Sequence, residues 1–146
     1  MIPLIVLVVS SAIFRLAGLE IAYFADWQRA LRAALGVMFL FTASAHWGRR
    51  RRDLIAMVPS FFGNGGMWVT LTGVAEVLIA LGLQIPRAAF AVATLAAAML
   101  ICIFPANAKA AREHLTIGGR SVPGLGLRLA VQLVFLAALV ASIWPR

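Results

Sequence analysis

A single carboxylate in a long apolar stretch constrains this chain more than any other feature. Residues 67–84 contain one ionisable side chain, Glu76, among side chains that are mostly apolar or small. At helical rise this stretch covers most of a ~30 Å hydrocarbon core, with Glu76 roughly 14 Å from its start. A carboxylate at that depth is costly unless it faces protein, water or a ligand. We therefore expect a transmembrane helix in which Glu76 has a partner.

Composition places the whole chain in the membrane class. Of its 146 residues, 63% are hydrophobic and 12% are charged, whereas a soluble domain has ~25% charged residues. The net charge of +8 resides mainly between the apolar runs, where it favours membrane lipids as partners rather than nucleic acid. Cys102 is the only cysteine, which excludes an intrachain disulfide, and we expect no metal site.

The apolar runs predict an all-α, polytopic transmembrane helix bundle that forms one domain over residues 1–146. Residues 51–63 are too short to cross, and Pro59 with the glycines that follow predicts an interfacial helix and loop. Asp26 is well placed to cap the second helix. The five predicted spans are residues 2–19, 30–46, 67–84, 88–104 and 124–144.

Basic residues predict the orientation of these spans. The consecutive residues Arg49, Arg50, Arg51 and Arg52 mark the cytoplasmic side and are expected to contact anionic lipid headgroups. Five spans then place the amino terminus in the cytoplasm and the carboxyl terminus outside. The predicted location is the inner (plasma) membrane of a cell.

Several polar residues interrupt the apolar pattern in one half of the predicted bundle. We expect them to line a ligand-binding pocket, with Pro59 in the loop at its mouth. Glu76 has three open interpretations: a structural partner of Arg128, Gln132 or His46, a ligand or proton site, or a protonated carboxyl facing lipid. No nucleophile or phosphate-binding loop accompanies these residues, so no catalytic residue is assigned. The predicted pocket residues are His46, Glu76, Asn107, Arg128 and Gln132.

Five short segments resemble the DoxX-like family of small bacterial integral membrane proteins. They are residues 41–46 (Phe-Thr-Ala-Ser-Ala-His), 57–59 (Met-Val-Pro), 71–76 (Leu-Thr-Gly-Val-Ala-Glu), 104–108 (Phe-Pro-Ala-Asn-Ala) and 128–132 (Arg-Leu-Ala-Val-Gln). The segments follow the family's order, but the loop after Pro59 has fewer prolines than in similar sequences. The resemblance implies a four-helix membrane core, to which residues 2–19 add an N-terminal helix.

The resemblance also sets the functional expectation. Some DoxX-like proteins belong to quinone-linked oxidoreductases and others to oxidative-stress complexes, which implies a membrane subunit or accessory of a redox system. The bound molecule would be a small lipophile with a polar head, either a quinone or a lipid. The chain has no intrinsic cofactor ligands, so we expect it not to be catalytic on its own.

Two other classes of function stay open. The chain is alternatively a non-catalytic membrane scaffold or assembly partner, in which the polar residues only fix helix packing. A transporter or proton path is less favoured, because the spans contain no second mid-membrane carboxylate. Other membrane redox subunits are candidate partners, and an oligomer is compatible with the sequence. Convergence of the polar residues on a cavity would favour binding over the scaffold.

Overall fold

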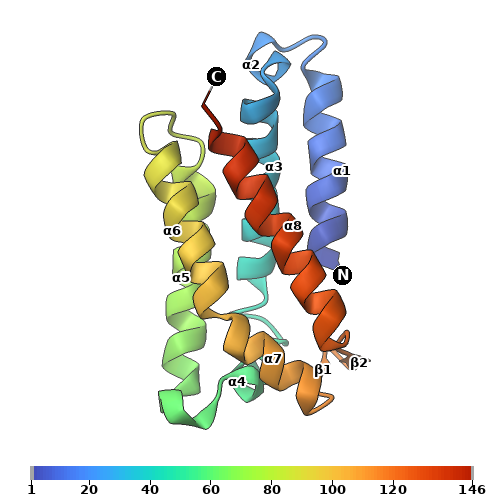
Figure 1. Cartoon of the computed structure of the whole chain (residues 1–146), viewed down its shortest axis with the longest axis vertical. Coiled ribbons are helices and arrows are strands. Elements are labelled where there is room, and N and C mark those ends of the chain that lie inside the picture. The colour runs from blue at the N-terminus through green and yellow to red at the C-terminus, as the bar shows by residue number, and fades with distance from the viewer. Residues whose placement is uncertain (1, 146) are drawn as a thin grey trace.

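The apolar runs of the sequence form the long helices of a bundle, and short elements occupy its ends (Figure 1). The computed structural model describes residues 2–145. The elements in chain order are α1 (Ile2–Ala17), α2 (Ala22–Ala25), α3 (Trp27–Ser44), α4 (Arg51–Met57), the 3-10 turn η1 (Ser60–Phe62), α5 (Gly65–Gly82), α6 (Ala89–Cys102), α7 (Phe104–Arg112), β1 (Thr116–Ile117), β2 (Arg120–Ser121) and α8 (Leu125–Ile143).

Within residues 2–145, three helical segments are long and apolar enough to cross a membrane: Gly65–Gly82, Ala89–Arg112 and Leu125–Ser142. The second of these combines α6 and α7. Helix α1 is apolar but shorter, with 16 residues. This result fits a membrane protein, and the prediction of five spans stays a prediction.

Helix α3 is shifted toward the amino terminus relative to the predicted span 30–46. The shift has a local cause, because the Asp26 carboxylate accepts hydrogen bonds from the backbone N–H groups of Gln28 (2.8 Å) and Arg29 (3.4 Å). These bonds satisfy donors that a helix start leaves unpaired, so the helix begins directly after Asp26. At its other end α3 stops at Ser44, which leaves His46 in the turn that follows.

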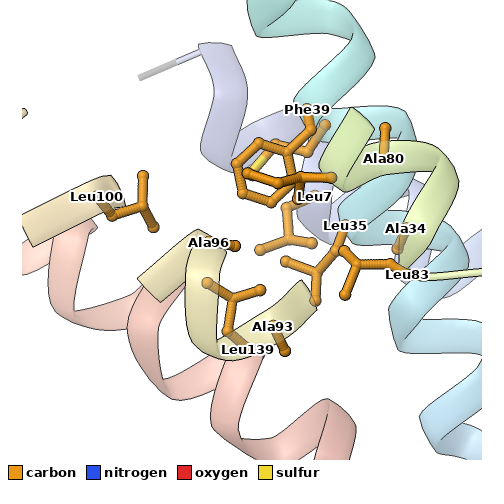
Figure 2. Close-up of a cluster of buried hydrophobic side chains, with 12 residues drawn as sticks. Leu7, Ala34, Leu35, Phe39, Ala80, Leu83, Ala93, Ala96, Leu100 and Leu139 are labelled. Carbon is orange, nitrogen blue, oxygen red and sulfur yellow. The ribbon is translucent and has the colours of Figure 1, made fainter. Parts of the chain in front are cut away.

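Helix α3 lies at the centre of the bundle and packs against α1, α5 and α8. Its buried side chains Leu35 and Phe39 meet Leu83, directly after α5, and Leu139 from α8 (Figure 2). Helix α6 contributes its small inward face, on which Ala89, Ala93 and Ala96 are almost fully buried. Small side chains allow helix backbones to approach closely, which is the usual basis of helix packing in membranes.

Glutamine side chains join helices across this core. Gln84, just beyond α5, donates from Nε2 to the backbone carbonyl of Arg32 on α3 at 3.1 Å. The contact needs Gly36, because a Cβ there would lie 2.7 Å from Gln84 Nε2. Gln28 at the start of α3 donates to the backbone carbonyl of Trp144 at 2.7 Å and thereby fixes the end of α8.

The two ends of the bundle differ. One end carries α4, α7 and the hairpin of β1 and β2, whereas α2 and the carboxyl terminus lie at the other (Figure 1). The hairpin lies between the predicted spans 88–104 and 124–144. Gly118 and Gly119 both have positive φ (59° and 75°), and a Gly-Gly pair between short extended segments is a signal for such a tight turn. The Asp53 carboxylate anchors this turn by accepting from the Gly118 N–H at 2.8 Å.

Candidate functional site

Glu76 lies in the middle of α5 and faces the interior of the bundle. Its side chain is buried, and so are Gly73 and Ala80 on the same face of the helix. Within residues 2–145, Glu76 Oε2 is buried and has no hydrogen-bond partner. A buried polar atom without a partner is uncommon and costs free energy. This atom is the strongest indication that the position does more than fill the core.

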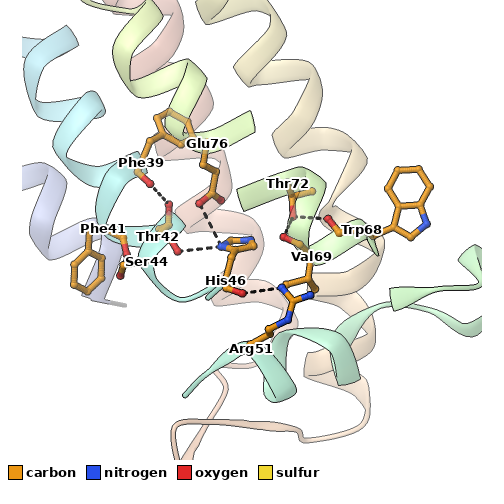
Figure 3. A network of polar contacts seen from close by, with 10 residues as sticks. All are labelled: Phe39, Phe41, Thr42, Ser44, His46, Arg51, Trp68, Val69, Thr72 and Glu76. Atoms are coloured by element: carbon orange, nitrogen blue, oxygen red, sulfur yellow. Dashed lines mark hydrogen bonds and ion pairs between the residues drawn. The ribbon is translucent and has the colours of Figure 1, made fainter. Parts of the chain in front are cut away.

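His46 is the residue that faces this carboxylate. Its Nδ1 atom lies 3.7 Å from Glu76 Oε2 (Figure 3). The same nitrogen is 3.2 Å from the backbone carbonyl of Thr42, one helical turn earlier. A carbonyl only accepts, so this bond requires a proton on Nδ1 and leaves Nε2 as an acceptor in the neutral ring. Nε2 makes no hydrogen bond to any residue that the structure describes.

Gly73 makes this approach possible. A Cβ at position 73 would lie 2.7 Å from the Cβ of His46 and 3.1 Å from the Trp47 ring. The turn after α3 therefore packs directly onto the backbone of α5. Because α5 begins eight residues before Gly73, it extends roughly 12 Å beyond this contact at helical rise. His46 consequently reaches the middle of α5 although it follows the end of α3.

The His46 side chain is held inside the protein. The residue is buried, with 8% of its surface exposed. The Arg51 guanidinium bonds to the His46 carbonyl rather than to the ring, so the ring nitrogen Nδ1 faces Glu76 and Thr42.

Arg51 holds the turn that carries His46. Its guanidinium donates to the carbonyl of His46 (2.9 Å), the carbonyl of Gly66 (3.0 Å) and the hydroxyl of Thr70 (2.9 Å). This side chain is half-buried, and its role as a lipid headgroup contact stays a prediction. The bonds join the start of α4 to the first turns of α5. The sequence analysis missed this role, since an arginine run gives no sign of which member turns inward.

The other predicted pocket residues form a second group, on α6, α7 and α8. Arg128 Nη1 donates to Asn107 Oδ1 at 2.5 Å, which joins α8 to α7. Gln132 Nε2 donates to the carbonyl of Leu100 at 3.1 Å, close to the break between α6 and α7. Arg128 and Gln132 thus bond to these groups rather than to Glu76. Arg128 Nε is also buried without a partner among the described residues.

The hydrogen bonds and ion pairs therefore divide the five predicted pocket residues into two groups, His46 with Glu76 and Asn107 with Arg128 and Gln132. Pro59 lines a third place, an open hollow of about 390 Å³ between η1 and α7. Glu76 does not line this hollow. The difference arises because α7 turns away after Cys102, carrying Asn107 toward the start of α8. Within residues 2–145, no cluster of His, Cys, Asp and Glu side chains could hold a metal ion.

Comparison with known proteins gives one match. Residues 35–143 match the model of a family described as a domain of unknown function, DUF8561. The chain belongs to the DUF8561 family. Every residue of both polar groups falls inside the match, whereas α1 lies outside it. No curated protein and no solved structure matches the chain. The resemblance to DoxX-like proteins stays a prediction.

Proposed function

We propose that this DUF8561 protein is an integral membrane protein of a bacterial inner membrane, with α1, α3, α5, α6 and α8 as its five spans. Large apolar side chains on the outside support this proposal: Leu78 is 63% exposed, Phe90 70% and Leu95 66%. Exposure of these large apolar side chains on α5 and α6 is unfavourable in water and favourable in lipid. The amino terminus faces the cytoplasm together with α4 and α7, and the carboxyl terminus lies outside.

Within this bundle, Glu76 and His46 bind the polar head of a small lipophilic molecule. The observation that carries this proposal is the buried Glu76 Oε2, which has no hydrogen-bond partner among the described residues and lies 3.7 Å from His46 Nδ1. A hydroxyl of a ligand would satisfy the carboxylate, and a second hydroxyl would donate to the free Nε2 of the neutral imidazole. A hydroquinone has two such groups, and its apolar tail suits the surrounding helices.

The role of the bound molecule follows from the resemblance to DoxX-like proteins. We propose a quinone-like ligand and a function as a membrane subunit or accessory of a redox or oxidative-stress system. The chain binds and orients the ligand, while a partner subunit carries out electron transfer. This division fits the absence of recognisable haem, flavin or iron–sulfur ligand motifs in the sequence.

Binding of a short-tail quinol, decylubiquinol, to the detergent-purified protein tests this proposal. We expect Glu76→Gln and His46→Gln each to weaken binding by roughly tenfold or more, since hydrogen bonds to buried polar and charged groups contribute about 1.5–3 kcal/mol. Glu20→Gln is the matched control, because Glu20 is an exposed acid in the link after α1. Equal affinity in the wild type and both site variants would contradict the proposal.

A membrane scaffold is the second candidate function. It is favoured by the bonds that the other polar residues make between helices, namely those of Arg51, Gln132 and the Arg128–Asn107 pair. If the protein is a scaffold, Glu76→Gln would lower its thermal stability, and neither the wild type nor the variant would bind a specific ligand. Measuring the melting temperature of each variant beside its quinol affinity separates the two functions.

A further inference from the structure

A hollow of about 290 Å³ lies at the carboxyl end of α3 and shares no lining residue with the Pro59 hollow. One part of its lining is apolar and aromatic, and the other carries two guanidinium groups. The lining residues are Phe41, Ser44, Ala45, Gly48, Arg49 and Arg50. No carboxylate is among them, so the electrostatic potential in the hollow favours an anion.

Arg49 and Arg50 differ from the next arginine in the run. The Arg51 guanidinium donates hydrogen bonds to three protein acceptors. Arg49 and Arg50 are exposed, and their guanidinium groups form no hydrogen bond or ion pair with any residue in the described part of the chain. The turn at Gly118 lies beside Arg50, since a Cβ there would be 3.5 Å from Arg50 Nε. Asp53 bonds to this turn rather than to either guanidinium.

An apolar stripe on α3 leads to the hollow. Val37, Leu40 and Phe41 lie three and four positions apart and therefore share one face of the helix with Ser44. Val37 is 38% exposed and Leu40 46% exposed. The Ser44 hydroxyl donates to the Phe41 carbonyl at 2.6 Å and so adds no unpaired donor to this face. The stripe is a surface on which an acyl chain can lie.

We propose that this hollow binds the phosphate of an anionic membrane phospholipid, with Arg49 and Arg50 on the phosphate and an acyl chain along Val37, Leu40 and Phe41. This inference rests on the proposed membrane insertion. Guanidinium groups bind phosphate through paired N–H donors, which gives both charge and geometric complementarity. The site explains why two arginines beside a membrane helix stay unpaired while their neighbour is used for structure.

Native mass spectrometry of the protein in detergent, titrated with dioleoylphosphatidylglycerol or dioleoylphosphatidylcholine, tests the site. We expect preferential binding of phosphatidylglycerol, and a loss of roughly tenfold or more in its affinity in the double variant Arg49→Gln, Arg50→Gln. Combined replacement of Arg112 and Arg120 by Gln is the control matched for charge, because both arginines are exposed, lie on α7 and β2 at the same end of the bundle and do not line the hollow. It should lose at most a small part of the affinity.

Three results would overturn the lipid site. They are unchanged phosphatidylglycerol binding in the double variant, an equal loss in the charge-matched control, and displacement of the lipid by millimolar glycerol 3-phosphate, which would assign the hollow to a soluble phosphate. Carbonate washing of membranes tests insertion separately. Extraction of the wild type by carbonate would refute the proposed membrane protein itself, whereas retention with unchanged lipid binding in the double variant would refute the headgroup site alone.

Discussion

The contact between Gly73 and His46 sets the geometry of the candidate site at the scale of single residues. The imidazole packs on the backbone of α5 where no side chain intervenes, and its Cγ would lie 2.8 Å from a Cβ at position 73. Both partners in this contact are fixed, one by the helix and the other by the bonds of Arg51. The distance between His46 and Glu76 therefore depends on a glycine one helical turn away.

Gly73→Ala tests this dependence. The added methyl group must displace the His46 turn, and overpacking of this kind costs about 1–3 kcal/mol. We expect a lower melting temperature in detergent together with weaker decylubiquinol binding. Gly126→Ala is the control, because a Cβ at position 126 meets no atom within 4 Å. A Gly73→Ala variant as stable as the control would contradict the close packing at His46.

Residue types alone singled out Glu76 and His46 as candidate site residues, and the reason is physical. A carboxylate in an apolar helix needs a partner, and the choice of partners was limited to a few polar side chains. The sequence could not show that His46 lies closest, because that contact depends on where α3 ends and on how the turn folds back. Arg128 and Gln132 are equally polar, yet they face α7 and α6.

At the scale of elements, Lys109 joins α7 to the short helix α4. Its ammonium donates to the carbonyls of Ala56 (2.7 Å) and Val58 (3.2 Å), which the end of α4 leaves without helical donors. The same helix contributes Met57 to the buried interior. The two bonds of Lys109 thus cap the end of α4. Because α4 also carries Arg51, this cap supports the turn that contains His46.

Lys109→Met tests the cap. Loss of both bonds should open α4 more often, and we expect backbone hydrogen exchange in α4 to rise about fivefold, equivalent to about 1 kcal/mol. Exchange in α8 should stay unchanged. Arg112→Gln is the control, since Arg112 is an exposed cation on the same helix. Its guanidinium makes no hydrogen bond or ion pair within residues 2–145. Equal exchange rates in α4 for both variants would contradict the cap.

Sequence patterns predict the presence of the long helices better than they predict the residues at which these helices begin and end. Apolar runs predicted each long helix, and the Asp26 cap was predicted and is confirmed. The start of α3 at Trp27 instead of residue 30 follows from that same cap, so the sequence contained the signal. The break between α6 and α7 lies beside Pro105, the second residue of α7, and the direction of α7 depends on its tertiary contacts with α4 and α8.

At the scale of the whole molecule, the two ends of the bundle should face opposite sides of the membrane. Arg52 lies at the end that carries α4 and α7, and Arg87 lies in the connection between α5 and α6 (Figure 1). In a Cys102→Ala background, we expect Arg52→Cys to react with an impermeant maleimide only from the cytoplasmic side. Arg87→Cys should react only from outside. Labelling of both from the same side would contradict the proposed topology.

The membrane class was predictable from composition, because no soluble core of this size could bury so much apolar surface. The count of spans is less well determined by sequence. Helix α1 is short, and α3 carries Arg29 and Arg32 near its start, so neither segment meets the length and hydropathy that mark the other three. Helix α1 packs against α3, and α3 packs against α5 and α8. These tertiary contacts, which the sequence does not show, join both segments to the three candidate spans.

Mass spectrometry of lipophilic molecules that copurify with the protein in nanodiscs tests the central claim most directly. The comparison is between the wild type and Glu76→Gln, with Glu20→Gln as control and melting temperatures to establish that each variant is folded. We expect one defined lipophile with a polar head in the wild type and the control, and its loss from the folded Glu76→Gln protein. Bulk lipid alone in all three samples would contradict the claim and favour a membrane scaffold.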